Sequence, residues 1–99
     1  MDCRIFVRGE IDLASAPQLE AQLGHAIDAS PADLIVDCKF LTFIDSTGMK
    51  VLVNAQRELD RRGRTLRLAN ANGFVTRVIG LLGLTELLRV EFAAPPVSA

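Results

Sequence analysis

The stretch LIVDCKFLTFIDSTGMKVLVNAQRELDRRG, residues 34–63, decides the fold because it contains one complete strand-to-helix unit. Leu34-Ile35-Val36 is a short, wholly apolar run, which predicts a central strand of a parallel sheet. Lys39 to Asp45 is predicted to be a connecting loop that carries a second apolar stretch. From Ser46 to about Arg62 the periodicity predicts the best helix of the chain, with Gly63 just after its end. The apolar stripe of that helix consists of Met49, Leu52, Val53 and Leu59.

A strand and a helix are also predicted on the N-terminal side. Apolar and other side chains alternate from Cys3 to Arg8, which predicts a half-buried strand that Gly9 ends. A helix is expected to follow, with Ser15 as its N-cap and Pro17 in its first turn. Ser30-Pro31 breaks this helix before the central strand begins.

The C-terminal side continues the alternation of strands and helices. The predicted elements are a strand from Leu66 to Ala69, a turn from Asn70 to Gly73, a helix from Phe74 to Leu82 that Gly83 stops, and a strand from Leu88 to Phe92. The resulting β-α-β-α-β-α-β order predicts an α/β protein with a four-stranded, mainly parallel or mixed sheet and right-handed connections.

Charge, cysteine content and hydropathy narrow the class of protein. Eleven Lys and Arg against twelve Asp and Glu give a net charge of −1. Proteins that bind the phosphate backbone of nucleic acids usually have an excess of Lys and Arg, so this balance argues against direct binding of nucleic acid. No stretch of apolar residues approaches the roughly 18 that a membrane span needs. The N-terminus lacks the basic region followed by an apolar stretch that is typical of a secretory signal. The length of 99 residues predicts a single domain, and the pattern of Cys3 and Cys38 is typical of reduced thiols in the cytoplasm.

The residues needed for ordinary catalysis are too few. The one histidine, His25, lies inside the first predicted helix, and no serine is placed beside it as a nucleophile would require. One His and two separated Cys do not make a metal site, and no phosphate-binding glycine loop is present. A phospho-aspartate receiver with Asp37 as acceptor would need an acidic cluster at the end of the first strand, where Arg8-Gly9-Glu10 stands. We therefore expect no enzyme, no catalytic residue, no metal and no cofactor.

The segment Asp45-Ser46-Thr47-Gly48 opens the most amphipathic helix and allows two interpretations. In the structural one, Asp45 or Ser46 is an N-cap, and Gly48 permits close packing. In the functional one, Ser46 carries a phosphate, because the free amides and the positive end of the dipole favour an anion there. The spacing of the residues alone favours the structural interpretation.

A family resemblance adds to this interpretation. The run Leu41-Thr42-Phe43-Ile44-Asp45-Ser46-Thr47-Gly48-Met49 resembles the signature of the STAS domain of bacterial anti-sigma factor antagonists. Gly9-Glu10-Ile11-Asp12, Leu34-Ile35-Val36-Asp37 and the segment from Val78 to Leu84 are similar to three further family motifs, in the family's order. The matches span most of residues 3–92.

The resemblance implies a regulatory protein rather than an enzyme. Such a protein binds an anti-sigma factor, itself a serine kinase, and so frees a sigma factor. The kinase would phosphorylate Ser46, with Thr47 as a minor candidate acceptor, and a PP2C-like phosphatase would restore the hydroxyl. The partner-binding residues implied by the family are Asp12, Asp45, Ser46, Thr47, Gly48 and Met49.

Both ends of the domain depart from the family pattern. Residues 1–94 are expected to form the STAS-like domain and residues 95–99 a frayed tail, without the family's first strand and last helix. An unpaired strand edge invites pairing with another chain, so a homodimer is among the expectations. The alternative function is a STAS-like scaffold or small-ligand-binding module that is not phosphorylated. A hydrolase that uses Ser46 is a third option, but it lacks a nearby base.

Overall fold

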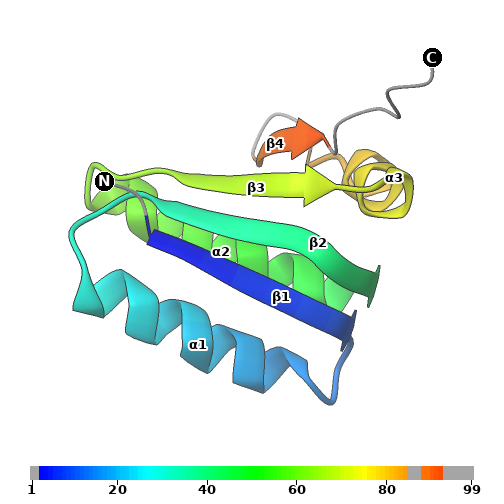
Figure 1. Cartoon of the computed structure of the whole chain (residues 1–99), viewed down its shortest axis with the longest axis horizontal. Helices are drawn as coiled ribbons and strands as arrows, with labels where there is room; N and C mark the ends of the chain where they lie inside the picture. Colours follow the sequence, from blue (N-terminus) through cyan, green and yellow to red (C-terminus); the bar gives the residue numbers. More distant parts are fainter. Residues whose placement is uncertain (1–2, 85–87, 93–99) are drawn as a thin grey trace.

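The computed structural model describes residues 3–84 and 88–92 and shows one α/β unit (Figure 1). All three strand pairs are parallel, and the strands lie side by side in the order β1-β2-β3-β4. The predicted alternation of strands and helices is therefore confirmed. The elements are β1 (Cys3–Ile11), α1 (Ala16–Ala29), β2 (Leu34–Ile44), α2 (Ser46–Arg61), β3 (Leu66–Ala71), α3 (Gly73–Leu81) and β4 (Arg89–Phe92).

Helices α1 and α2 cover the same face of the sheet, since consecutive crossovers of one hand place their helices on one side. Figure 1 shows α2 behind the strands, α1 beside β1, and α3 beyond the carboxyl end of β3. One buried cluster joins the inward side chains of the sheet to those of the helices. It includes Ile5 and Val7 of β1, Leu19 and Leu23 of α1, Leu34 and Val36 of β2, and Leu52 and Leu59 of α2.

The prediction of a loop from Lys39 to Asp45 is wrong, because β2 continues to Ile44 and pairs with β1 along its whole length. The two strands change register twice, so that Gly9 pairs with Leu41 and Ile11 with Ile44. The inward residues of this half of β2 are therefore three apart, at Cys38, Leu41 and Ile44, and no two-residue periodicity is visible. Gly9 does not end β1 either, because its φ of +70° lets the strand continue to Ile11.

The turn that leads into α1 also differs from its prediction. Ser15 stands at the N-cap position, but its side chain makes no capping hydrogen bond to the helix. The Ser15 hydroxyl instead donates to the Glu10 carbonyl at 3.1 Å and accepts from the Asp12 amide at 2.9 Å. His25 is exposed on α1, as expected of a helix residue without a catalytic role.

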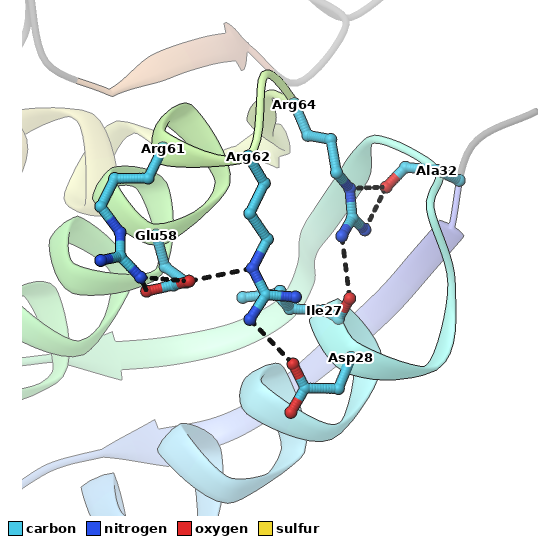
Figure 2. A network of polar contacts seen from close by, with 7 residues as sticks. All are labelled: Ile27, Asp28, Ala32, Glu58, Arg61, Arg62 and Arg64. Carbon is cyan, nitrogen blue, oxygen red and sulfur yellow. Dashed lines mark hydrogen bonds and ion pairs between the residues drawn. The ribbon is translucent and has the colours of Figure 1, made fainter.

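A network of arginines joins the carboxyl ends of α1 and α2 (Figure 2). Gly63, with φ +70°, donates to the Asp60 carbonyl, and Arg64 donates to that of Leu59, which is the pattern of a Schellman motif. The guanidinium of Arg64 then donates to the Ile27 carbonyl at 2.8 Å and twice to the Ala32 carbonyl. It thereby satisfies the Ile27 carbonyl in the last turn of α1, which has no partner within the helix, and the Ala32 carbonyl in the segment between α1 and β2.

Asp37 is a buried structural residue, so the receiver-like interpretation of it is wrong. Its carboxylate accepts from Arg4 at 2.5 Å, from Asn70 at 2.9 Å and from the Lys39 amide at 2.9 Å. Burial alone would raise the pKa of Asp37, but these donors outweigh it and the pKa lies below its usual value. Next to it, burial raises the pKa of the Cys38 thiol to about 12, which keeps that thiol protonated and unreactive.

Two features of residues 3–84 and 88–92 bear on the sequence-based expectations about membrane spans and metal sites. No helix there is long and apolar enough to cross a membrane. No group of three or more His, Cys, Asp or Glu side chains could hold a metal ion in this part of the chain. The predicted tail, residues 95–99, lies outside the described residues.

Candidate functional site

The predicted site lies at the carboxyl edge of the sheet, where β2 passes into α2. Asp45 is the N-cap of α2: its backbone is extended, and its carboxylate accepts from the Gly48 amide at 3.0 Å. The Asp45 carbonyl accepts the first helical bond, from Met49 at 3.0 Å. This geometry confirms the structural interpretation of Asp45 and satisfies one of the free amides at the helix start.

Gly48 is required by packing. A Cβ atom added to it would lie 2.6 Å from Cγ2 of Ile11 and 2.7 Å from Cγ1 of Ile44, well inside van der Waals contact. Both isoleucines belong to the buried cluster, so neither can move away without disturbing the core. The small residue thus lets the first turn of α2 approach the sheet closely.

Met49 does not lie on the surface. Its side chain is fully buried in the core, so the expectation that it contacts a partner is corrected. The amphipathic pattern of α2 already indicates this, because Met49 shares the apolar stripe with Leu52 and Val53. Gly48 is buried as well, and it shapes the site without offering a side chain to it.

Asp12 lies in the turn between β1 and α1, which one backbone bond holds against the α2 start. The Asp45 amide donates to the Ile11 carbonyl at 3.1 Å, and this places Asp12 next in sequence to the junction. The Asp12 carboxylate accepts from the amides of Ala14 at 3.0 Å and Ser15 at 3.1 Å. Asp12 therefore fixes the shape of this turn beside the predicted acceptor.

Among the site residues predicted from the sequence, Ser46 is the exposed one. It is the first residue of α2, and Thr47 beside it is half-buried. A shallow cleft of about 330 Å³ runs from Thr47 between the starts of α1 and α2. Its walls include Leu13 and Lys50, which the sequence interpretation missed. Leu13 is 75% exposed, and an apolar side chain in an otherwise polar turn was the available signal.

Comparison with known proteins identifies the family. A family model described as the STAS domain matches residues 2–94. The chain belongs to the STAS domain family. This STAS domain is 30% identical over 90 residues to the anti-sigma-B factor antagonist of Bacillus subtilis. The aligned residues make up 91% of this chain and 82% of the relative. It is 33% identical over 88 residues to the anti-sigma-F factor antagonist RsfB of Mycobacterium tuberculosis, covering 87% and 70% of the two chains.

A solved structure supports the same conclusion for this STAS domain. The unphosphorylated form of the anti-sigma factor antagonist SpoIIAA superposes with a TM-score of 0.75 at 26% identity, over 90% of this chain and 78% of that one. A phosphorylated form of SpoIIAA from Bacillus, 24% identical, superposes with a TM-score of 0.68 over 90% and 81% of the two chains. The relatives compared here are thus regulatory proteins named as anti-sigma factor antagonists.

Proposed function

We propose that this STAS domain is an anti-sigma factor antagonist that binds an anti-sigma factor serine kinase and so releases a sigma factor. Phosphorylation at Ser46 switches it off, and a PP2C-like phosphatase switches it on again. The observation that carries the proposal is the exposure of Ser46 at the first position of a 16-residue helix whose N-cap is already supplied by Asp45. The hydroxyl of Ser46 is not used in capping, so it is available to a kinase.

The position of Ser46 tolerates a phosphate in the folded protein. The amino end of α2 presents a positive dipole, which offsets an added negative charge there. The side chain is exposed, so the phosphate requires no repacking of the core. A phosphate adds roughly −1.5 to −2 charges, which more than doubles the net charge of −1 on the domain.

The surface around Ser46 supports a small mixed interface with the kinase. Thr47 and Lys50 supply polar groups on α2, and Leu13 adds an exposed apolar side chain across the cleft. Asp12 and Asp45 hold the two turns in place. Phosphorylation places roughly −1.5 to −2 charges inside this contact and beside the Asp45 carboxylate, where the phosphate loses water on docking, so partner binding weakens.

The experiment compares the affinities of wild-type protein and Ser46→Asp for the anti-sigma factor kinase of the same organism, by calorimetry or pull-down. We expect about a hundredfold weaker binding for Ser46→Asp, equivalent to about 2.8 kcal/mol. Gln22→Glu is the matched control, since it adds one negative charge at an exposed position of α1. Equal affinity of wild type and Ser46→Asp contradicts the switch.

Phosphorylation itself is tested separately by intact-mass measurement after incubation with the kinase and ATP. Wild type is expected to gain one phosphate located at Ser46, while Ser46→Ala gains none and keeps its affinity for the kinase. A phosphate that persists in Ser46→Ala and disappears in Thr47→Ala would move the acceptor to Thr47. No phosphate on wild type would favour an unphosphorylated scaffold or small-ligand-binding module.

A second copy of the chain is a further partner that the sheet topology supports. Strand β1 is the end of the β1-β2-β3-β4 order, and β2 is the strand that pairs with it among the described residues. An edge of this kind can pair with the same edge of another chain. Sedimentation equilibrium tests for a homodimer, and a monomer at high concentration would contradict this part of the proposal.

A further inference from the structure

The aromatic residues whose side chains the structure describes lie outside the core. The chain has five Phe and no Trp or Tyr. Four of the five, Phe6, Phe40, Phe43 and Phe74, lie on the surface and are between 40% and 42% exposed. The buried hydrophobic residues of the described chain are aliphatic or sulfur-containing. Aromatic side chains are usually among the largest contributors to cores and interfaces, so their placement at the surface needs a separate explanation.

These four side chains form a stripe, which we call the aromatic stripe, on and beside the sheet face that α1 and α2 leave open. Phe6 and Phe40 contact each other across β1 and β2, with ring centroids 6.0 Å apart. Phe43 of β2, in register with Glu10 of β1, contacts Phe74 of α3 with centroids 5.5 Å apart. The strands seen in front of α2 in Figure 1 carry this face. The stripe thus follows β2 towards the carboxyl edge of the sheet.

The open face also carries an excess of positive charge. Arg8 lies over the ring of Phe40, with Cζ 4.4 Å from its centroid, and Lys39 Nζ lies 5.6 Å from the same centroid. Further towards the amino end of the strands, Arg4 of β1 and Arg67 of β3 flank Ile35 of β2 at the same register position. Among the side chains that the structure describes on this face, Asp37 is buried against Arg4, and Glu10 is the exposed carboxylate. Arg8 and Lys39 thus outnumber Glu10 around the exposed rings, although the whole chain has a net charge of −1.

A cleft of about 450 Å³ opens where this face meets the edge of β1. Phe6, Arg8 and Glu10 line it from β1, and Gln18 and Gln22 line it from α1. It is therefore bounded by apolar, cationic and amide groups and by one carboxylate, that of Glu10, and it can receive a side chain from a molecule seated on the aromatic stripe.

We propose that the open face is a docking surface for an acidic, amphipathic segment of a partner protein. Apolar side chains of that segment pack on the aromatic stripe, and its carboxylates pair with Arg8 and Lys39 at the rim. Phe and Arg are both enriched at the cores of protein interfaces relative to the rest of the surface, and Arg is also enriched among hot spots. This proposal is independent of phosphorylation at Ser46.

Two other occupants fit the same face less well. A single-stranded nucleic acid stacks its bases on free ring faces. Here Arg8 already covers Phe40, and the ring pairs are tilted by 43° and 31°. A second copy of the chain stacked face to face would bring two cationic surfaces together, and like charges across an interface disfavour binding.

The probe is a synthetic amphipathic helix of about 18 residues, or about five turns, with Leu and Phe on one side and Glu on the other. A matched peptide carries Lys in place of Glu. Fluorescence anisotropy with the full chain is expected to give a Kd in the micromolar range for the Glu peptide and no measurable binding for the Lys peptide. Raising the salt concentration is expected to weaken binding, because the rim charges are exposed.

Variants of the open face identify where the Glu peptide binds. Phe40→Ala and Arg8→Glu are each expected to weaken binding by at least about tenfold. The matched controls Leu81→Ala, at an exposed apolar position on α3, and Arg57→Glu, on α2, are expected to leave the affinity unchanged. If Phe40→Ala lowers the thermal midpoint of unfolding, its weaker binding could reflect loss of folded protein. Arg8→Glu then carries the test, because Arg8 is exposed and its substitution leaves the core unchanged.

Four outcomes would overturn the proposal. They are failure of the Glu peptide to bind, equal binding of both peptides, tighter binding of oligo(dT) or of phosphatidylserine vesicles than of the Glu peptide, and self-association that Phe40→Ala abolishes. Ser46→Asp is expected to bind the Glu peptide like wild type. The failure of this proposal therefore leaves the Ser46 switch untouched, and the reverse also holds.

Discussion

At the carboxyl end of α2, charged side chains are engaged with neighbouring groups, whereas at its amino end a hydroxyl is left exposed. Glu58 accepts from Arg61 at 2.6 and 2.8 Å and from Arg62 at 2.9 Å, and Arg62 also lies 3.0 Å from Asp28 (Figure 2). These bonds hold the pKa of the Glu58 carboxyl below its usual value, with the bond from Arg61 as the largest cause. At the other end, one carboxylate caps the helix and Ser46 remains at the surface.

The two ends of this one helix therefore differ in role: the side chains at the carboxyl end stabilise the fold, whereas the amino end carries the proposed site. A guanidinium bound to two backbone carbonyls, as Arg64 is, has its donors committed to the fold. The amino end instead obtains its stability from the fit of Gly48 against the sheet, which leaves the side chain of Ser46 exposed. Three substitutions test whether the two ends differ in this way.

The largest effect is expected at the packed glycine. Gly48→Ala places a methyl group 2.6 and 2.7 Å from two buried isoleucines, and overpacking of this kind costs about 2 kcal/mol after the better helix propensity of Ala is counted. Urea denaturation measures the loss in the free energy of unfolding. Ser46→Ala, two residues away and exposed, is the control and should change it by less than about 0.5 kcal/mol. Equal stability of Gly48→Ala and wild type would contradict the claim that the amino end of α2 depends on the close packing of Gly48.

A smaller loss is expected at the carboxyl end. Arg64→Met keeps the aliphatic length of the side chain but leaves the Ile27 and Ala32 carbonyls without their donor, at a cost of about 1.5 kcal/mol in the free energy of unfolding. Arg61→Met is the matched control. It removes an exposed ion pair to Glu58, which is worth less than about 0.5 kcal/mol. If the two variants lost the same stability, the Arg64 bonds would not contribute more than a surface pair.

The smallest effect is expected at the cap. Asp45→Ala removes the acceptor for the Gly48 amide and should cost about 1 kcal/mol, measured by thermal and urea denaturation. Asp45→Asn retains a side-chain oxygen and should cost much less. The pair separates capping from charge: if Asp45→Asn keeps its stability but loses affinity for the kinase, the carboxylate itself contributes to recognition.

Much of the fold could be predicted because it depends on local signals. The apolar stripe of α2 and the glycines at 63 and 83 mark helix faces and ends through periodicity and left-handed backbone, which short stretches of sequence specify. The second half of β2 could not be predicted in this way. Its inward residues depend on two register changes against β1, and such a shift is a property of the pair of strands.

The candidate site was predictable in part for the same reason. Asp45 as a cap and Gly48 as a close-packing residue follow from their positions at a helix start, and the structure confirms both. Met49 was misplaced, because Ser46 of the same motif is exposed while the Met49 side chain belongs to the core stripe. Leu13 was missed, since it comes from a turn more than 30 residues earlier in the chain that packs beside α2.

The amino-acid sequence by itself determined the order of strands and helices, the position of Ser46 at the start of α2, and a motif that resembles one family. These properties depend on residues close together in the chain, whose periodicity and capping preferences act locally. The tertiary structure alone decided that Asp12 and Leu13 lie beside the start of α2, that Met49 is buried, and that four Phe gather around the open face. These properties depend on the parallel pairing of distant strands, which brings separate turns to one edge and separate side chains to one face.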